Sequence, residues 1–431
     1  MTLLAGATAT AMLASHAQAD VAGDALINKL EQKGVLTTDE AKQLRLENQQ
    51  DYNSSFTNNF NKAFGKMTGM PDWVTGYKFS GDFRGRYDYL GSDYTTDRGR
   101  LRYRIRAGLV VNMKDNLEVG FRLGSGDGGP LSNNQTLQDL STKKNIYIDA
   151  AYGKWTPIND GTWMLSSTIG KMDNPFHFTP MVFDPDLTPE GGALTGKYTL
   201  NDRQNITFAG AGLVLAEVAS STHDPFMYGG EVTLNSKWND KLSSTIGAGG
   251  FQIVSPGQLT TTNTIKLYNY GNTLGAGNAP AYNFNPLIAD ASVTYTLNSF
   301  PLYQGKFPIK LAGEFMNNPG APSNNNGFWA GVTFGKAGKK HNWDLSYRYE
   351  YLESDAWYAQ LVDDDNAAYF GAPTGISGGT NIKGHLVKAN YNLTDSLSLT
   401  FTCYANDLIK NTSGKPNSGA IHAMADVMWK F

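Results

Sequence analysis

Cysteine, charge and long apolar runs are all scarce in this sequence. Cys403 is the only cysteine, which excludes an intramolecular disulfide and argues against a thiolate metal cluster. Charged residues make up 17 %, whereas ordinary soluble domains contain about 25 %. The net charge of −3 and the lack of a basic tail argue against nucleic acid as a partner. No run of about 18 apolar residues follows the N-terminal stretch, which argues against a spanning helix but not against spanning strands.

Residues that could carry catalysis or bind metal lack the necessary spacing. The later histidines are scattered, and no Ser/His/Asp or Cys/His arrangement can be identified. Gly124 to Gly129 fits G-x-G-x-x-G, but Pro130 follows instead of a helix, so we expect a flexible outer loop. The run Asp363 to Asn366 could bind Ca²⁺, although a solvated surface run is the preferred interpretation. We therefore expect no enzymatic activity, no cofactor and no metal.

The N-terminal region has its own pattern. An apolar, small-residue stretch ends in Ala17-Gln18-Ala19, which predicts a signal peptide over residues 1–19, although the usual basic start is missing. Residues 20–72 are predicted to form a helical hairpin and a polar tether, with Thr37 and Glu40 as a capping box. Periplasmic contact through the leucines of this hairpin and a plain soluble extension both remain open.

A period of two begins near Trp73. In the segment Tyr77–Tyr89, alternate residues are aromatic on one face and charged on the other. In Arg100–Val111 four arginines alternate with apolar residues. A helix would distribute these charges around its circumference, whereas a strand gathers them on one side. The pattern therefore predicts β-strands with one apolar and one polar face.

About sixteen such strands are predicted between residues 73 and 431. Short turns such as Lys114-Asp115 and Asn239-Asp240 alternate with long connections such as Met172–Gly192 and Glu353–Thr380. Short turns at one end and long loops at the other are typical of outer-membrane barrels. We therefore expect an all-β fold, a transmembrane antiparallel β-barrel of about sixteen strands with a short α-helical N-terminal segment. A soluble two-layer sandwich is the alternative.

The C-terminus supports this prediction. Apolar residues alternate on one face of the last strand and end with Trp429 and Phe431. A terminal aromatic residue after such alternation resembles the signal that outer-membrane barrels present to their assembly machinery.

Several stretches carry a family likeness, and they are Leu30–Leu44, Phe79–Tyr89, Arg98–Gly124, Gly170–Phe176 and Asp184–Leu194. On these stretches the mature chain resembles the putative porin family of Gram-negative outer membranes. The resemblance implies a porin-like barrel with passive solute passage, and it does not fix the solute.

The most distinctive polar feature is a set of arginines on three neighbouring predicted strands. We expect one basic wall of the lumen from Arg84, Arg86, Arg102, Arg104, Arg106 and Arg122. Asp82, Asp88 and Glu118 on the same strands could neutralise it, so a wall of ion pairs is the alternative.

The long connection Met172–Gly192 is acidic and rich in proline. We expect it to fold into the lumen and to oppose the basic wall as a constriction, through Asp173, Asp184, Asp186 and Glu190. A field across the opening would then select solutes by charge. An outward surface loop is the alternative.

The predicted function is a water-filled outer-membrane channel for passive diffusion of small hydrophilic solutes and ions. A substrate-specific channel with an aromatic track of Trp357, Tyr358, Tyr369 and Phe370 is one alternative, and a non-transport adhesin or structural barrel is another. Expected partners are outer-membrane lipid, lipopolysaccharide, the barrel-assembly machinery and small solutes. A homotrimer could pack through small residues near Gly210, Gly212, Gly247, Ala248 and Gly249.

Overall fold

A computed structural model describes Leu30 and residues 71–92, 95–260, 271–366, 368–369, 376–411 and 419–431. Residues 77–111 and 115–431 form one compact unit, and residues 1–76 with 112–114 form another. The first of these units contains the barrel and is described below. The predicted signal peptide and, apart from Leu30 and residues 71–72, the predicted hairpin and tether lie outside the described residues.

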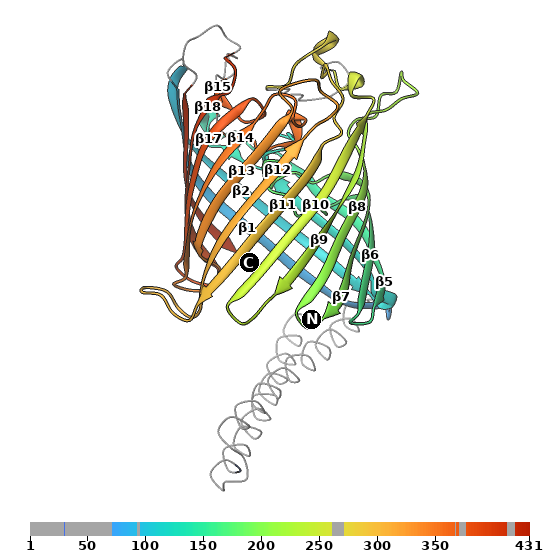
Figure 1. Ribbon diagram of the computed structural model, residues 1–431, viewed down its shortest axis with the longest axis vertical. Coiled ribbons are helices and arrows are strands. Elements are labelled where there is room, and N and C mark those ends of the chain that lie inside the picture. The colour runs from blue at the N-terminus through green and yellow to red at the C-terminus, as the bar shows by residue number, and fades with distance from the viewer. Residues whose placement is uncertain are drawn as a thin grey trace, which may run out of the picture. The chain divides into compact units, whose positions relative to one another are not determined.

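The strands form a closed antiparallel barrel, in which sixteen long strands and the two-residue β4 share one sheet (Figure 1). Each long strand pairs with its neighbours in the chain, and β1 closes the ring against β19 from Asp82↔Lys430 to Ser92↔Ala420. The strands of the barrel are β1 (Val74–Ser92), β2 (Thr95–Met113), β3 (Leu117–Ser125), β4 (Gln135–Thr136), β5 (Ile146–Asn159), β6 (Trp163–Lys171), β7 (Glu190–Asn201), β8 (Gln204–Val214), β9 (Phe226–Lys237), β10 (Leu242–Val254), β11 (Leu287–Leu297), β12 (Phe307–Asn317), β13 (Asn326–Gly335), β14 (Trp343–Leu352), β17 (Ile382–Asn392), β18 (Leu397–Leu408) and β19 (Ala420–Lys430). The predicted barrel of about sixteen strands is confirmed.

The remaining elements are short. A separate two-stranded sheet is formed by β15 (Ala368–Tyr369) and β16 (Ile376–Ser377). The helices are single 3₁₀ turns, η1 (Lys114–Asn116), η2 (Asp139–Ser141), η3 (Pro256–Gln258), η4 (Ala276–Asn278) and η5 (Ala359–Leu361). Among the described residues, no helix has the length and apolar character needed to cross a membrane.

Alternation along each strand separates an outer apolar face from an inner polar face. On β12, Leu311 is 62 % exposed and Phe315 is 50 % exposed, whereas Glu314 between them in the alternation is buried. Large apolar residues that remain this exposed in an isolated chain suit contact with lipid hydrocarbon. The inner face therefore carries the groups that a solute would meet.

Small residues do not all lie on the outer face as expected. A Cβ added to Gly247 would meet the Asp290 carboxylate, and one added to Gly249 would meet the ring of Phe178. Both positions therefore face the lumen and cannot pack between barrels. Alternation leaves Gly210, Gly212 and Ala248 on the outer face.

The terminal aromatic residues lie at the closure of the barrel. Phe431 packs near Phe79, with ring centroids 5.8 Å apart, and Trp429 packs near Phe83 at 5.7 Å. Trp429 and Phe431 are both exposed. Their predicted role as an assembly signal remains a prediction.

Candidate functional site

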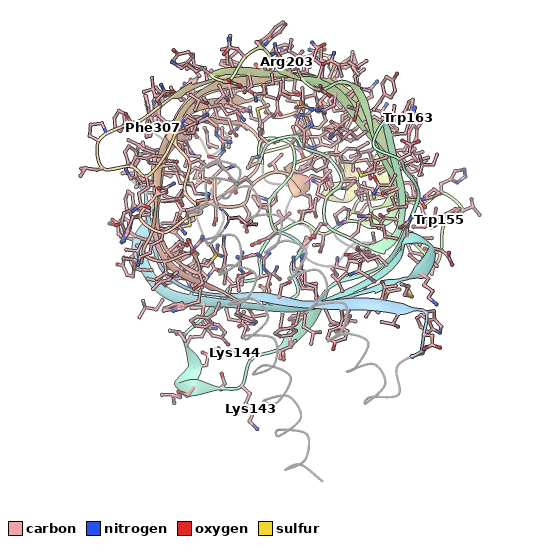
Figure 2. All side chains as sticks on the ribbon, turned by 90° about the horizontal axis from the view of Figure 1, so that it is seen from below. Lys143, Lys144, Trp155, Trp163, Arg203 and Phe307 are labelled. Atoms are coloured by element: carbon pink, nitrogen blue, oxygen red, sulfur yellow. The ribbon has the colours of Figure 1, made fainter. Side chains whose placement is uncertain are left out.

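Loop segments cross the inside of the barrel, as the view along the ring of strands shows (Figure 2). The connection between β6 and β7, residues 172–189, is here called loop A. The described part of the connection after β14, residues 353–366, is called loop B. Contacts of both loops with opposite strands, described next, place them inside the lumen.

Loop A meets arginines on β2 and β3. The Asp186 carboxylate accepts a hydrogen bond from Nη1 of Arg104 at 3.0 Å and lies 3.6 Å from Nη1 of Arg106. The Asp173 carboxylate accepts one from Nη2 of Arg122 at 2.6 Å. Charge-assisted hydrogen bonds of this kind fix the position of a loop more firmly than neutral ones.

The arginines of β1, β2 and β3 form the basic sector of the inner wall, and each has carboxylate partners. Arg86 pairs with Asp426 (2.7 Å) and Asp365 (3.1 Å), Arg100 and Arg102 with Asp88 (2.6 and 3.2 Å), Arg104 and Arg106 with Asp82 (2.9 and 2.8 Å), Arg122 with Asp149 and Asp173, and Arg84 lies 3.9 Å from Asp426. The set contains as many aspartates as arginines. Its charges are therefore largely compensated within the wall, as the ion-pair alternative described.

Loop A meets carboxylates on the other side of the lumen. His177 places Nδ1 2.8 Å from Glu231 on β9 and Nε2 3.2 Å from Asp290 on β11. Thr179 donates its hydroxyl to Glu314 on β12 at 2.7 Å. Glu231, Asp290 and Glu314 are called the acidic sector, and in the strand order they lie across the barrel from β1–β3. Hydrogen bonds with Asp290 and Glu231 raise the pKa of His177 to about 10, so its imidazole is protonated at neutral pH.

Loop B supports loop A through a buried apolar cluster. Trp357 is fully buried, packs against Phe183 and Phe251, and donates its indole N–H to the Val182 carbonyl at 2.9 Å. The Asp184 N–H donates to the Leu361 carbonyl at 2.8 Å. Aromatic packing and backbone hydrogen bonds therefore join the two loops into one inner layer.

Burial overturns two interpretations of loop B. The run Asp363–Asn366 is not a solvated surface run, because Asp363 and Asn366 are buried and Asp365 pairs with Arg86. Burial alone would raise the pKa of Asp365, but Arg86 and nearby cations outweigh burial and hold this pKa at about 2. Trp357 and Tyr358 are also buried in the cluster and cannot line an aromatic track. The side chains of Tyr369 and Phe370 lie outside the described residues.

Two acidic residues assigned to the constriction do not face the arginines. Asp184 is buried, and its carboxylate accepts the N–H groups of Asp186 (2.6 Å) and Asp364 (3.1 Å). Glu190 is the first residue of β7 and lies 3.3 Å from Lys171. The sequence showed the charge of these residues but not the direction in which the chain turns at each of them.

Asp184 also belongs to a small group of carboxylates. Ligand oxygens of Asp184, Asp363 and Asp364 lie within 4.8 Å of one another, the arrangement among described residues that could hold a metal ion. Burial and mutual repulsion raise the pKa of Asp184 and that of Asp364 well above the usual range. Proton uptake can therefore relieve this repulsion without a metal.

Two further residues lie elsewhere than expected. Glu118 accepts a hydrogen bond from the Tyr152 hydroxyl at 2.8 Å and does not pair with an arginine. The segment expected as a flexible outer loop enters the lumen at Asn134, which accepts a hydrogen bond from Arg84 at 2.7 Å.

The acidic sector and His177 were missed in the sequence. A signal was present, because Glu231, Asp290 and Glu314 all fall on the polar face of predicted strands. Each carboxylate is isolated in its own strand, however, whereas the arginines occur in a visible run.

Comparison with known proteins agrees with this architecture. The sequence profile described as putative porin matches residues 89–306 and 309–428. No curated protein matches the chain. The high-pH structure of Pseudomonas putida OprB is similar at 13 % identity with a TM-score of 0.54, covering 83 % of this chain and 94 % of that chain. A mutant of Rh. blastica porin matches at 10 % identity and a TM-score of 0.41, covering 83 % of this chain and all of that chain.

The profile match covers more than half of the sequence, and the chain therefore belongs to the putative porin family.

Proposed function

We propose that the protein is an outer-membrane porin that lets small hydrophilic solutes and ions diffuse passively through a water-filled lumen. The family and the porin-like barrel support a channel for small solutes. The observation that carries the proposal is the closed barrel of sixteen long strands, a size that leaves room for an aqueous channel. The exposed outer apolar face suits an integral membrane protein.

Loop A sets the narrowest part of the channel in this proposal. Its support is the pair of attachments, with Asp186 on the basic sector and His177 on the acidic sector. A loop held at both sides of the lumen divides the cross-section and keeps its charged groups at fixed positions. The prolines of loop A restrict its backbone further.

The proposed setting is the outer membrane, with the short turns and the N-terminal segment on the periplasmic side. Outer-membrane lipid and lipopolysaccharide would contact the exposed apolar face. Trp429 and Phe431 would be read by the assembly machinery. A homotrimer is proposed as the assembled form.

Swelling of liposomes tests the proposed function directly. Purified protein is reconstituted, and swelling is followed in a series of uncharged sugars of increasing size. We expect passage of the small sugars and a rate that falls as solute size increases, because the lumen contains loops A and B. Protein-free liposomes and liposomes with heat-denatured protein are the controls. A reconstituted barrel that passes no sugar and conducts no ions would contradict the proposal and favour a structural barrel.

A further inference from the structure

Three lysines on the inner face have no carboxylate partner within ion-pair distance in the described part of the chain. These residues, Lys197 on β7, Lys310 on β12 and Lys388 on β17, are all exposed. The basic sector differs from them, because its arginines are matched by aspartates. A solute in the lumen would therefore feel the lysines more than the arginines.

The ladders place each lysine on the inner face. Lys310 alternates with Glu314, which binds Thr179 of loop A. Lys388 lies opposite Thr402 on β18, the strand whose Tyr404 binds Asp363 of loop B. Paired residues of antiparallel strands share a face, and residues two apart return to it.

Lys197 is placed in the same way through two ladders. It lies opposite Thr207 on β8, and Thr207 hydrogen-bonds to Thr233 on β9. Thr233 alternates with Glu231, which binds His177 inside the lumen. All three lysines therefore face the same space.

The lysines also share a level in the barrel. β7 ends at Asn201, β17 ends at Asn392 and β12 begins at Phe307, so each lysine lies close to the short-turn end of its strand. Loops A and B are attached at the opposite end. The lysines therefore surround the vestibule at the short-turn end, beyond the inner layer formed by the loops.

Negative charge at this level is limited. Lys154 and Glu118 are cross-strand partners and add no net charge. Asp344 on β14 faces this vestibule and accepts a hydrogen bond from Asn390 at 2.6 Å. The neighbouring turns contribute further cations, Lys306, Lys336, Lys339 and Lys340. The balance of charge at the short-turn end is therefore positive.

We propose that Lys197, Lys310 and Lys388 make the channel prefer small anions, inorganic or carboxylate, over cations of the same size. The inference rests on the proposed function and names its solute class. Rings of lysine or arginine favour anions in pores, and a vestibule with low-dielectric walls concentrates the field of its charges. Exposed ammonium groups can exchange water for a passing anion without first breaking an ion pair, which the arginines of the basic sector would have to do.

Reversal potentials in planar bilayers test this inference. Under a KCl gradient around 0.1 M, we expect chloride permeability to exceed potassium permeability by about twofold, because the Debye length there is about 10 Å. The ratio should approach one near 1 M KCl. The variant Lys310→Glu/Lys388→Glu should invert the preference, and Lys310→Gln/Lys388→Gln should bring the ratio close to one.

A matched control is available on the outside of the barrel. Lys143 and Lys144 lie outside the ring of strands (Figure 2), so Lys143→Glu/Lys144→Glu makes the same change in net charge away from the lumen. The control should keep the wild-type ratio. If it shifts the ratio as much as the inner pair does, the inference is overturned.

The remaining outcomes separate the two proposals. A wild-type channel that conducts without anion preference overturns the inference and leaves the porin function intact. A protein that inserts but does not conduct overturns the porin function itself. If the glutamate pair does not assemble, the glutamine pair decides, and an unchanged ratio in that variant overturns the inference.

Discussion

The basic sector and the acidic sector of the inner wall are neutralised in different ways. On β1, β2 and β3, the arginines find most of their partners on strands, in Asp82, Asp88, Asp149 and Asp426. On β9 and β11, Glu231 and Asp290 have His177 of loop A as their described cation within ion-pair distance. The basic sector is thus largely compensated without loop A, whereas the acidic sector depends on it.

This difference shows where loop A is held most strongly. A loop end that adds one more carboxylate to a compensated wall contributes little, because the arginines keep their other partners. A loop end that supplies the counter-charge for buried carboxylates contributes much more, because its loss leaves them unpaired. We therefore expect the two attachments of loop A to respond unequally to equivalent substitutions.

The largest effect is expected at the acidic sector. His177→Gln keeps a hydrogen-bonding side chain but removes the charge between Glu231 and Asp290. Breaking a buried pair costs about 3–5 kcal/mol, and partial exposure of His177 reduces the expected cost to about 2 kcal/mol. Loop A should then open more often, and chymotrypsin should cleave faster at Phe176, Phe178 and Phe183, which are buried in the intact protein.

His177→Lys is the matched variant for this prediction. It restores a cation at the same position, so cleavage should return toward the wild-type rate. Equal cleavage rates for wild type and His177→Gln would show that the acidic sector does not hold loop A.

The same attachment should weaken at high pH. The pKa of His177 is raised from 6.5 to about 10, so its contribution is complete below pH 6.5 and is lost as the pH rises through about 10. Single-channel conductance should therefore rise between pH 8 and pH 11, as loop A leaves the acidic sector. His177→Gln is the reference that removes contributions from other titrating groups, and a wild-type curve parallel to it would contradict the assignment.

A smaller effect is expected at the basic sector. Asp186→Asn weakens the contacts with Arg104 and Arg106, but both arginines retain Asp82. The expected loss is about 1 kcal/mol, with a correspondingly smaller rise in chymotrypsin cleavage than for His177→Gln. Asp173→Asn is the control, because the Asp173 side chain is 72 % exposed and its ion pair should contribute least. If Asp186→Asn exceeds His177→Gln, the order of the two sectors is reversed.

The barrel could be predicted from the sequence more fully than its interior. Alternation in Tyr77–Tyr89 and Arg100–Val111 reveals strands because side chains of a strand have a period of two. The same alternation places Arg104 and Glu314 on the inner face. It cannot predict that Asp184 turns toward loop B while Asp186 turns toward Arg104, because both lie in a loop without a period. Burial of Trp357 likewise depends on contacts between distant segments.

Single-channel conductance of a loop A replacement tests the central claim most directly. Lys171 and Glu190 are cross-strand partners, and the Met172 N–H bonds to the Pro189 carbonyl at 3.0 Å, so a short Gly-Ser linker can replace residues 173–188 while the barrel ladder is kept. If loop A forms the constriction, conductance should rise at least about twofold, because the obstacle inside the lumen is removed. A correctly folded replacement with wild-type conductance would contradict the account.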